Sequence, residues 1–142
     1  MTSQLNVDTI VDKAGSGGTN VKVGNTSTYV SDGGSATQNL VQGLCKAFVV
    51  YGEDTAIDAG SFNIGSLTDV GTGVTDHNFT NNFESNESYT CSVACIPGTD
   101  VAERPRLSVC NTSNTRTVNE EVDTSTDRDA DQFHYSAHGD LA

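Results

Sequence analysis

The stretch Ser88-Tyr-Thr-Cys-Ser-Val-Ala-Cys-Ile96 decides the fold class of this 142-residue chain. Larger apolar side chains alternate along it with small ones, until Pro97-Gly98 ends the pattern. Side chains of a β-strand point alternately to the two faces of a sheet, so this alternation is typical of a strand with one buried face. The predicted buried face carries Tyr89, Cys91, Val93 and Cys95.

Short segments of the same kind, separated by turn signals, recur through the C-terminal part of the chain. They cover residues 48–51, 55–58, 61–68, 74–79, 104–111, 115–124 and 132–137. Short strands at such regular spacing indicate two packed sheets or a closed barrel. We therefore expect an all-β fold, an antiparallel β-sandwich or barrel of about seven or eight short strands.

The N-terminal part has a different character. A short alternating apolar segment is followed at once by a tract rich in Gly, Ser, Thr and Asn. It has neither the basic start of a signal peptide nor the apolar length of a membrane span, so no membrane insertion is expected. A single strand of this size needs a partner to pair with. We expect residues 1–37 to form an anchoring arm and linker, with residues 38–142 as the second domain. The predicted anchoring residues are Leu5, Val7, Ile10 and Val11.

Residues 36–48 show helical spacing. Leu40, Leu44 and Phe48 recur every four residues, Val41 lies beside them, and Thr37 is a suitable N-cap. The spacing predicts a short helix before the β domain. Its narrow apolar stripe has two equally good partners, namely the same stripe on other copies of the chain or the chain's own β domain.

Charge and composition restrict the function. The chain has 7 Lys and Arg against 19 Asp and Glu, a net charge of −12. This balance argues against nucleic-acid binding, which needs a basic footprint, and against adhesion to anionic lipid. With 5 Phe, 4 Tyr and no Trp, the core is thin. A monomer of this kind is marginally stable, and assembly with identical copies is a common remedy.

The four cysteines fit reduced, partly buried thiols better than a disulfide framework, because no secretory signal precedes them. Cys91 and Cys95 have the spacing of a metal pair. On a strand, however, they lie about 13 Å apart, so they can neither bridge nor share one zinc ion.

Two groups of side chains are candidates for binding. Three alternating carboxylates in an acidic segment have the oxygen ligands that calcium prefers, although a solvated acidic loop is the simpler interpretation. Guanidinium groups and an aromatic ring suit the recognition of sugars and anionic glycans. The calcium candidates are Asp127, Asp129 and Asp131, and the carbohydrate candidates are Arg104, Arg106 and Tyr135.

Catalytic motifs give no support for an enzyme. The chain contains no Gly-x-Ser-x-Gly elbow, no HExxH sequence and no Gly-rich phosphate loop leading into a helix. His134 and His138 lie on a predicted strand, where four residues separate them by about 13 Å, and His77 also lies on a predicted strand. We expect these histidines to be surface or hydrogen-bonded core residues, and we expect no catalytic residue and no cofactor.

Four segments together resemble a known family. They are Leu5-Asn-Val-Asp-Thr-Ile-Val-Asp-Lys-Ala-Gly15, Thr37-Gln-Asn-Leu-Val-Gln-Gly-Leu-Cys-Lys-Ala-Phe48, Asp58-Ala-Gly-Ser-Phe-Asn-Ile-Gly-Ser-Leu-Thr-Asp-Val-Gly-Thr-Gly73 and Asn78-Phe-Thr80. In these segments the chain is similar to the fibre-like virion proteins of marine bacteriophages. The resemblance extends over roughly residues 3–80 and implies a homotrimeric fibre or spike on the head or tail.

The resemblance implies a structural virion protein, assembled in the bacterial host cytoplasm. At this length a trimeric head fibre or capsid decoration protein is expected, anchored through its arm to a capsid or tail protein. The alternative is a tail-fibre or receptor-binding tip that recognises a host surface glycan or outer-membrane protein. In either case Leu40, Val41, Leu44 and Phe48 are the expected trimerisation residues, and Arg104, Arg106 and Tyr135 the candidate host contacts.

Overall fold

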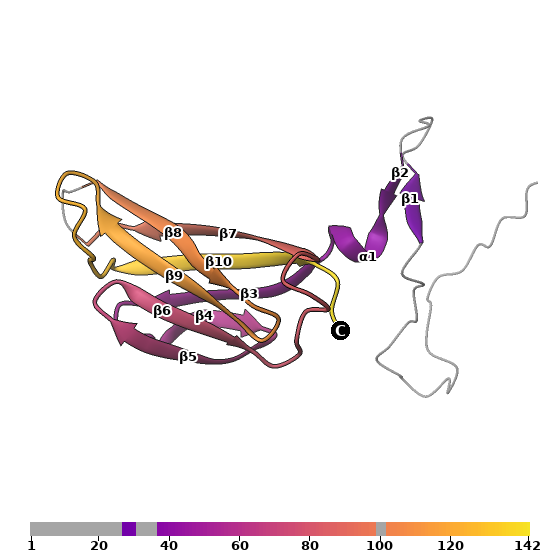
Figure 1. Cartoon of the computed structure of the whole chain (residues 1–142), viewed down its shortest axis with the longest axis horizontal. Helices are drawn as coiled ribbons and strands as arrows, with labels where there is room; N and C mark the ends of the chain where they lie inside the picture. The colour runs from indigo at the N-terminus through magenta and orange to yellow at the C-terminus, as the bar shows by residue number, and fades with distance from the viewer. Residues whose placement is uncertain (1–26, 31–36, 99–101) are drawn as a thin grey trace, which may run out of the picture. The chain divides into compact units, whose positions relative to one another are not determined.

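A computed structural model describes residues 27–30, 37–98 and 102–142 (Figure 1). The chain separates into two units after Val41. In the first unit, β1 (Thr28–Val30) pairs with β2 (Thr37–Asn39) as a short antiparallel ladder. One helical turn, α1 (Leu40–Gly43), spans the boundary between the units. The four predicted anchoring residues of the arm lie outside the described residues.

The second unit is an all-β sandwich of eight antiparallel strands in two sheets, which confirms the predicted fold class. The first sheet has the order β4-β3-β10-β7 and the second the order β5-β6-β9-β8. Figure 1 shows the two sheets packed face to face. The strands are β3 (Cys45–Gly52), β4 (Ile57–Phe62), β5 (Ile64–Gly71), β6 (Val74–Phe79), β7 (Tyr89–Ile96), β8 (Glu103–Cys110), β9 (Asn114–Glu121) and β10 (Gln132–Gly139).

The chain passes from the first sheet to the second through a single residue. Asn63 separates β4 from β5 and has a φ of 57°, a conformation that asparagine tolerates better than most residues. Its side chain fixes this corner, since Nδ2 donates to the Asn81 carbonyl at 3.0 Å and Oδ1 accepts from the Asn81 amide at 2.7 Å. The corner therefore places the β5–β6 hairpin in the second layer.

A column of four rings fills the space between the sheets. Tyr51 stacks on Phe133 with centroids 5.0 Å apart, and His77 stacks on Tyr135 at 4.4 Å. Tyr51 also meets the edge of His77 at 5.3 Å, which joins the two stacks. Ring pairs in such offset and edge arrangements add to the free energy gained by burying their area. The column supplies much of the large apolar surface that a chain with so few aromatics can bury.

Two buried polar side chains near this column are well hydrogen-bonded. His77 is fully buried, and its Nε2 is 3.1 Å from the Tyr51 hydroxyl while its Nδ1 is 3.4 Å from the Thr115 hydroxyl. Asn119, also fully buried, donates to Glu103 Oε2 at 2.7 Å and to the Arg128 carbonyl at 2.8 Å. Such pairing offsets the cost of removing these groups from water, so the polar side chains belong to the core.

The predicted helix over residues 36–48 is wrong in extent. Only Leu40–Gly43 is helical, and β3 begins at Cys45. A spacing of four residues keeps side chains on one face of a helix, but it also keeps them on one face of a strand, whose period is two. Gly43 weakens the helix, and pairing with β4 and β10 extends the strand through Phe48.

No helix among the described residues is long and apolar enough to cross a membrane.

The burial of His77 makes the stability of the sandwich depend on pH. Burial lowers the pKa of His77 from 6.5 to about 4, so the unfolded chain takes up a proton at a higher pH than the folded chain does. Stability is therefore lost as pH falls from 6.5 towards 4, by about 2 kcal/mol between pH 7 and pH 5 from this group alone. Urea unfolding at the two pH values measures the loss.

The matched control for this measurement is the exposed His134. His77→Gln should be less stable at neutral pH but should lose about 2 kcal/mol less than the wild type on acidification, whereas His134→Gln should keep the wild-type loss. Equal losses in all three proteins would contradict the assignment of the pH dependence to His77.

Candidate functional site

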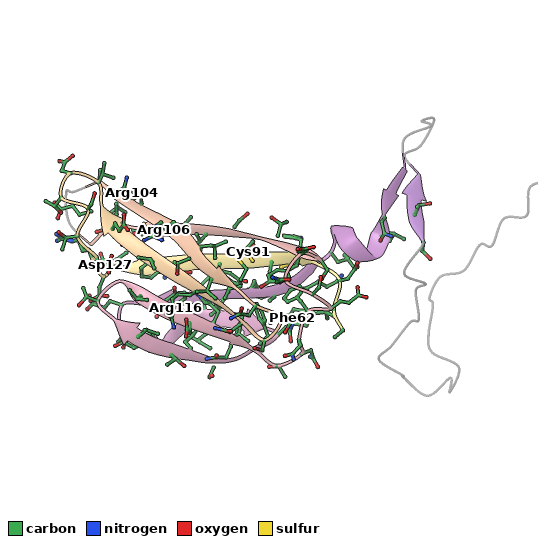
Figure 2. All side chains as sticks on the ribbon, in the orientation of Figure 1. Phe62, Cys91, Arg104, Arg106, Arg116 and Asp127 are labelled. Carbon is green, nitrogen blue, oxygen red and sulfur yellow. The ribbon has the colours of Figure 1, made fainter. Side chains whose placement is uncertain are left out.

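The outer surfaces of the two sheets differ in chemistry. On the second sheet the outward side chains form ion pairs. Arg116 binds Asp76 through two hydrogen bonds of 2.6 and 2.8 Å, and Glu120 is held between Arg104 and Arg106 at 3.0 and 2.7 Å. Figure 2 shows Arg104 and Arg106 near each other at the same end of the sandwich. This surface is charged and internally paired.

On the outer surface of the first sheet, eight neighbouring side chains from β3, β4, β7 and β10 include no carboxylate. We call these eight residues the apolar face. The members on β3, β7 and β10 alternate with more buried side chains and therefore point away from the core, and Phe62 on β4 shares their face as the cross-strand neighbour of Phe48. The eight residues are Phe48 and Val50 on β3, Phe62 on β4, Ser92, Ala94 and Ile96 on β7, and His134 and Ser136 on β10.

Strand register brings these side chains into contiguous rows. His134 lies between Val50 and Ala94, and Ser136 lies between Phe48 and Ser92. Phe48 in turn is the cross-strand neighbour of Phe62, and the two rings stack with centroids 6.5 Å apart. Cross-strand ring pairs stabilise a sheet, yet here Phe48 remains 40% exposed and Phe62 51% exposed.

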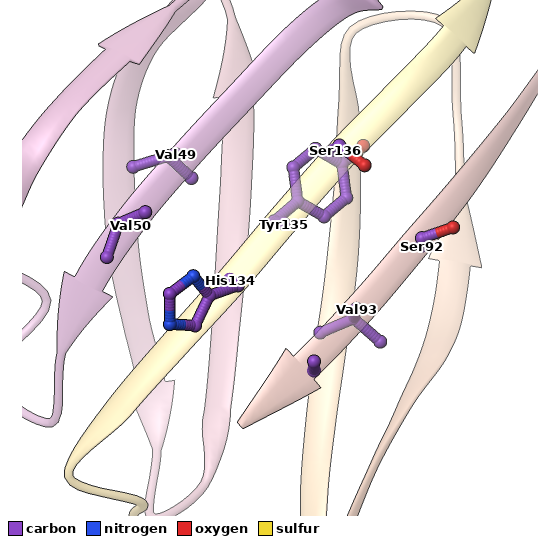
Figure 3. A pocket seen from close by; sticks show the side chains of 8 residues that line it. Val49, Val50, Ser92, Val93, His134, Tyr135 and Ser136 are labelled. Carbon is purple, nitrogen blue, oxygen red and sulfur yellow. The ribbon is translucent and has the colours of Figure 1, made fainter. Parts of the chain in front are cut away.

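Small side chains hollow the middle of the apolar face. A shallow groove of about 290 Å³ crosses β3, β10 and β7, with His134 and Ser136 on its floor (Figure 3). The groove is shallow where small side chains line it, and Val50 lines it on the β3 side. The small side chains are those of Ser92 and Ala94 on β7 and Ser136 on β10. The His134 ring makes a 3.1 Å hydrogen bond with Gln132 along the same strand. The groove is therefore open, largely apolar and without an enclosed end.

The predicted trimerisation residues do not form one helical stripe. Leu40 lies in α1, Leu44 lies between α1 and β3, and Phe48 lies within β3. All three are exposed, at 41%, 60% and 40%, and Phe48 belongs to the apolar face. The side chain of Val41 is not among those described. Apolar surface is thus available at these residues, although a strand rather than a helix presents Phe48.

The three aspartates proposed as calcium ligands lie along the segment between β9 and β10. Asp129 Oδ1 accepts a hydrogen bond of 2.5 Å from the Gly73 amide, and Asp127 forms an isolated bridge with Glu120. Among the described residues, no three His, Cys, Asp or Glu side chains lie close enough to hold a metal ion. The structure therefore does not gather these aspartates into one ligand set.

The carbohydrate candidates separate into two groups. Arg104 and Arg106 are half exposed on the second sheet, and their hydrogen bonds, that of Arg106 foremost, lower the pKa of Glu120. The prediction that Tyr135 contacts a host surface is wrong, because its side chain is only 3% exposed and its hydroxyl lies 3.1 Å from Cys91 Sγ. Since β10 is a central strand, the second sheet covers its inward side chains.

His77 is one of the hydrogen-bonded core histidines that the sequence allowed, whereas nothing in the sequence predicted the apolar face. His77 shares its face of β6 with Phe79, two residues further on, and that alternation was a usable signal for burial. The apolar face had no comparable signal, because it combines residues from strands that pair only in the folded chain.

Comparison with known protein families, with curated proteins and with solved structures finds no match for this chain.

Proposed function

We propose that this chain is a non-enzymatic structural protein of a bacteriophage virion, a homotrimeric head fibre or capsid decoration protein. Its N-terminal arm would bind a capsid or tail protein, and its sandwich would be displayed outward. Assembly would take place in the bacterial host cytoplasm. The observation that carries this proposal is the apolar face, which a single copy leaves open to water. The resemblance to fibre-like virion proteins supports the same class.

The contiguity of the exposed apolar groups favours an interface. Single exposed apolar side chains are ordinary on soluble proteins and need no explanation. Here Phe48 and Phe62 stack on each other, and Val50 and Ala94 continue the surface on either side of His134. Interface centres are depleted in charge and enriched in aromatic residues, and this face has both properties.

Electrostatics favour the same face for contact between copies. Each copy carries a net charge of −12, so two copies repel each other over most of their surfaces. The eight residues of the apolar face include no carboxylate, so two such faces can meet without direct charge repulsion, while Asp58 lies outside the set and accepts a hydrogen bond from Gln132. A second copy is therefore the occupant we assign to this face, and the paired charges of the second sheet would remain in water.

The alternative function is a tail-fibre or receptor-binding tip. One observation favours it specifically. Arg104 and Arg106 point outward from the second sheet on either side of the Glu120 carboxylate, and each side chain is half exposed. Guanidinium groups in this arrangement suit an anionic glycan of a host surface. The pair lies on the second sheet, so it would stay accessible when the apolar face is covered.

A carboxylate placed on the apolar face should abolish assembly. Ala94 is exposed and neighbours His134, so Ala94→Glu would bury a charge in every copy of the interface. Burying an unpaired charge costs several kcal/mol, so the association constant should fall at least about 100-fold. Sedimentation velocity on the full chain should show a trimer for the wild type and a monomer for Ala94→Glu.

The matched control is Ser108→Glu, which adds the same charge at an exposed position of β8 on the second sheet. This variant should remain trimeric. A wild type that stays monomeric at tens of micromolar, or a trimer that survives Ala94→Glu, would refute assembly through this face.

Anchoring is tested separately with purified phage heads and tails. Full-length protein should co-sediment with heads, and a chain that begins at Thr37 should not, because it lacks the predicted anchoring strand. Binding to tails alone, or to immobilised host glycan with loss on Arg106→Ala, would favour the receptor-binding alternative. A protein that binds no particle and no glycan would contradict both functions.

A further inference from the structure

The strands β7 and β8 lie at the edges of the two sheets, and they face each other across the sandwich. Contacts near both ends fix how they align. The Tyr89 hydroxyl donates to the Asn111 carbonyl at 2.7 Å, and Cys95 Sγ lies 4.0 Å from Glu103 Oε2. The start of β7 therefore lies beside the end of β8, although the two strands belong to different sheets.

This alignment brings two of the four thiols together. Cys91 lies two residues after Tyr89 on β7, and Cys110 directly precedes Asn111, so the hydrogen bond from Tyr89 to Asn111 aligns the two cysteines.

Cys110 is the cross-strand neighbour of Thr115, whose hydroxyl lies 3.4 Å from the His77 ring. His77 stacks on Tyr135, and the Tyr135 hydroxyl lies 3.1 Å from Cys91 Sγ, so both cysteines flank the same ring stack. Cys91, labelled in Figure 2, is partly buried. Cys110 is the last residue of β8 and is exposed. Cys110 is followed directly by a turn, where the backbone can adjust to the short distance that a disulfide requires.

We propose that Cys91 and Cys110 form a disulfide that links the two sheets once the protein meets an oxidant such as glutathione disulfide. The exposed Cys110 thiolate attacks one sulfur of glutathione disulfide, and a glutathione thiolate leaves. Cys91 then gives its proton to solvent and attacks Cys110 Sγ, so that the protein disulfide forms and the second glutathione leaves. Two protein thiols are oxidised, and one glutathione disulfide is reduced to two glutathione molecules.

The other thiols are not placed for this bond. Cys45 lies at the start of β3 with its thiol donating to the Ala47 carbonyl, and Cys95 lies four residues along β7 from Cys91. Burial raises the pKa of the Cys91 thiol to about 11, which keeps it protonated near neutrality. The second step should therefore quicken by roughly tenfold for each pH unit between pH 7 and pH 9.

The bond would restrain the unfolded chain and join the edges of the two layers. It forms within one copy, so it requires neither a trimer nor a virion. A disulfide that closes a loop of this length should raise the melting temperature of a small domain by about 10 °C. Dithiothreitol should reverse the increase.

The test uses full-length protein incubated with glutathione disulfide at pH 8, then unfolded, alkylated and mapped by mass spectrometry. The wild type should lose two alkylatable thiols and yield one cross-linked peptide pair containing Cys91 and Cys110. Cys45→Ser, the matched control, should behave identically. Cys91→Ser should stop at the mixed disulfide and carry one glutathione on Cys110.

Three results would overturn the proposal. They are full retention of free thiols in the wild type, an intramolecular bond between any other pair, and formation at the same rate in urea, which would show that the fold does not align the thiols. The peptide map of the wild type decides the matter even where a serine variant fails to fold.

Discussion

The ring column between the sheets is the interaction on which the rest of the structure depends. Tyr51, Phe133, His77 and Tyr135 come from β3, β10 and β6, so their packing joins the two layers. Two of the four rings carry hydroxyls and one is an imidazole, and these groups bond to one another or to neighbouring side chains. A chain poor in large apolar residues thus completes its core with polar rings whose hydrogen bonds are made inside it.

The inward direction of these rings also determines the outer surfaces. Because strand side chains alternate, burying Phe133 and Tyr135 turns His134 and Ser136 outward, and burying Val49 and Tyr51 does the same to Phe48 and Val50. The same alternation on β6 and β9 turns Asp76, Arg116 and Glu120 outward on the second sheet. One sandwich therefore presents a charged, internally paired surface and an apolar one, which suits a protein that assembles through one side and faces water with the other.

Local patterns predicted the strands, and pairing between distant strands created what they missed. The alternation of residues 88–96 and the glycine-containing turn at residues 69–73 are local, and β7 and the β5–β6 hairpin follow them. The burial of Tyr135 depends on β10 being a central strand, and the alignment of Cys91 with Cys110 depends on two edge strands in different sheets. The four-residue spacing that predicts a helix through Phe48 also fits a strand, and only pairing with β4 and β10 decides between the two elements.

Hydroxyl-radical footprinting of the full-length protein tests most directly whether copies meet through the apolar face. Oxidation of Phe48 and Phe62 is followed below and above the concentration at which the protein associates, with Val70, 46% exposed on β5, as the reference. The account predicts that association protects both phenylalanines several-fold and leaves Val70 unchanged. Equal oxidation of Phe48 and Phe62 in the free and associated protein would contradict it.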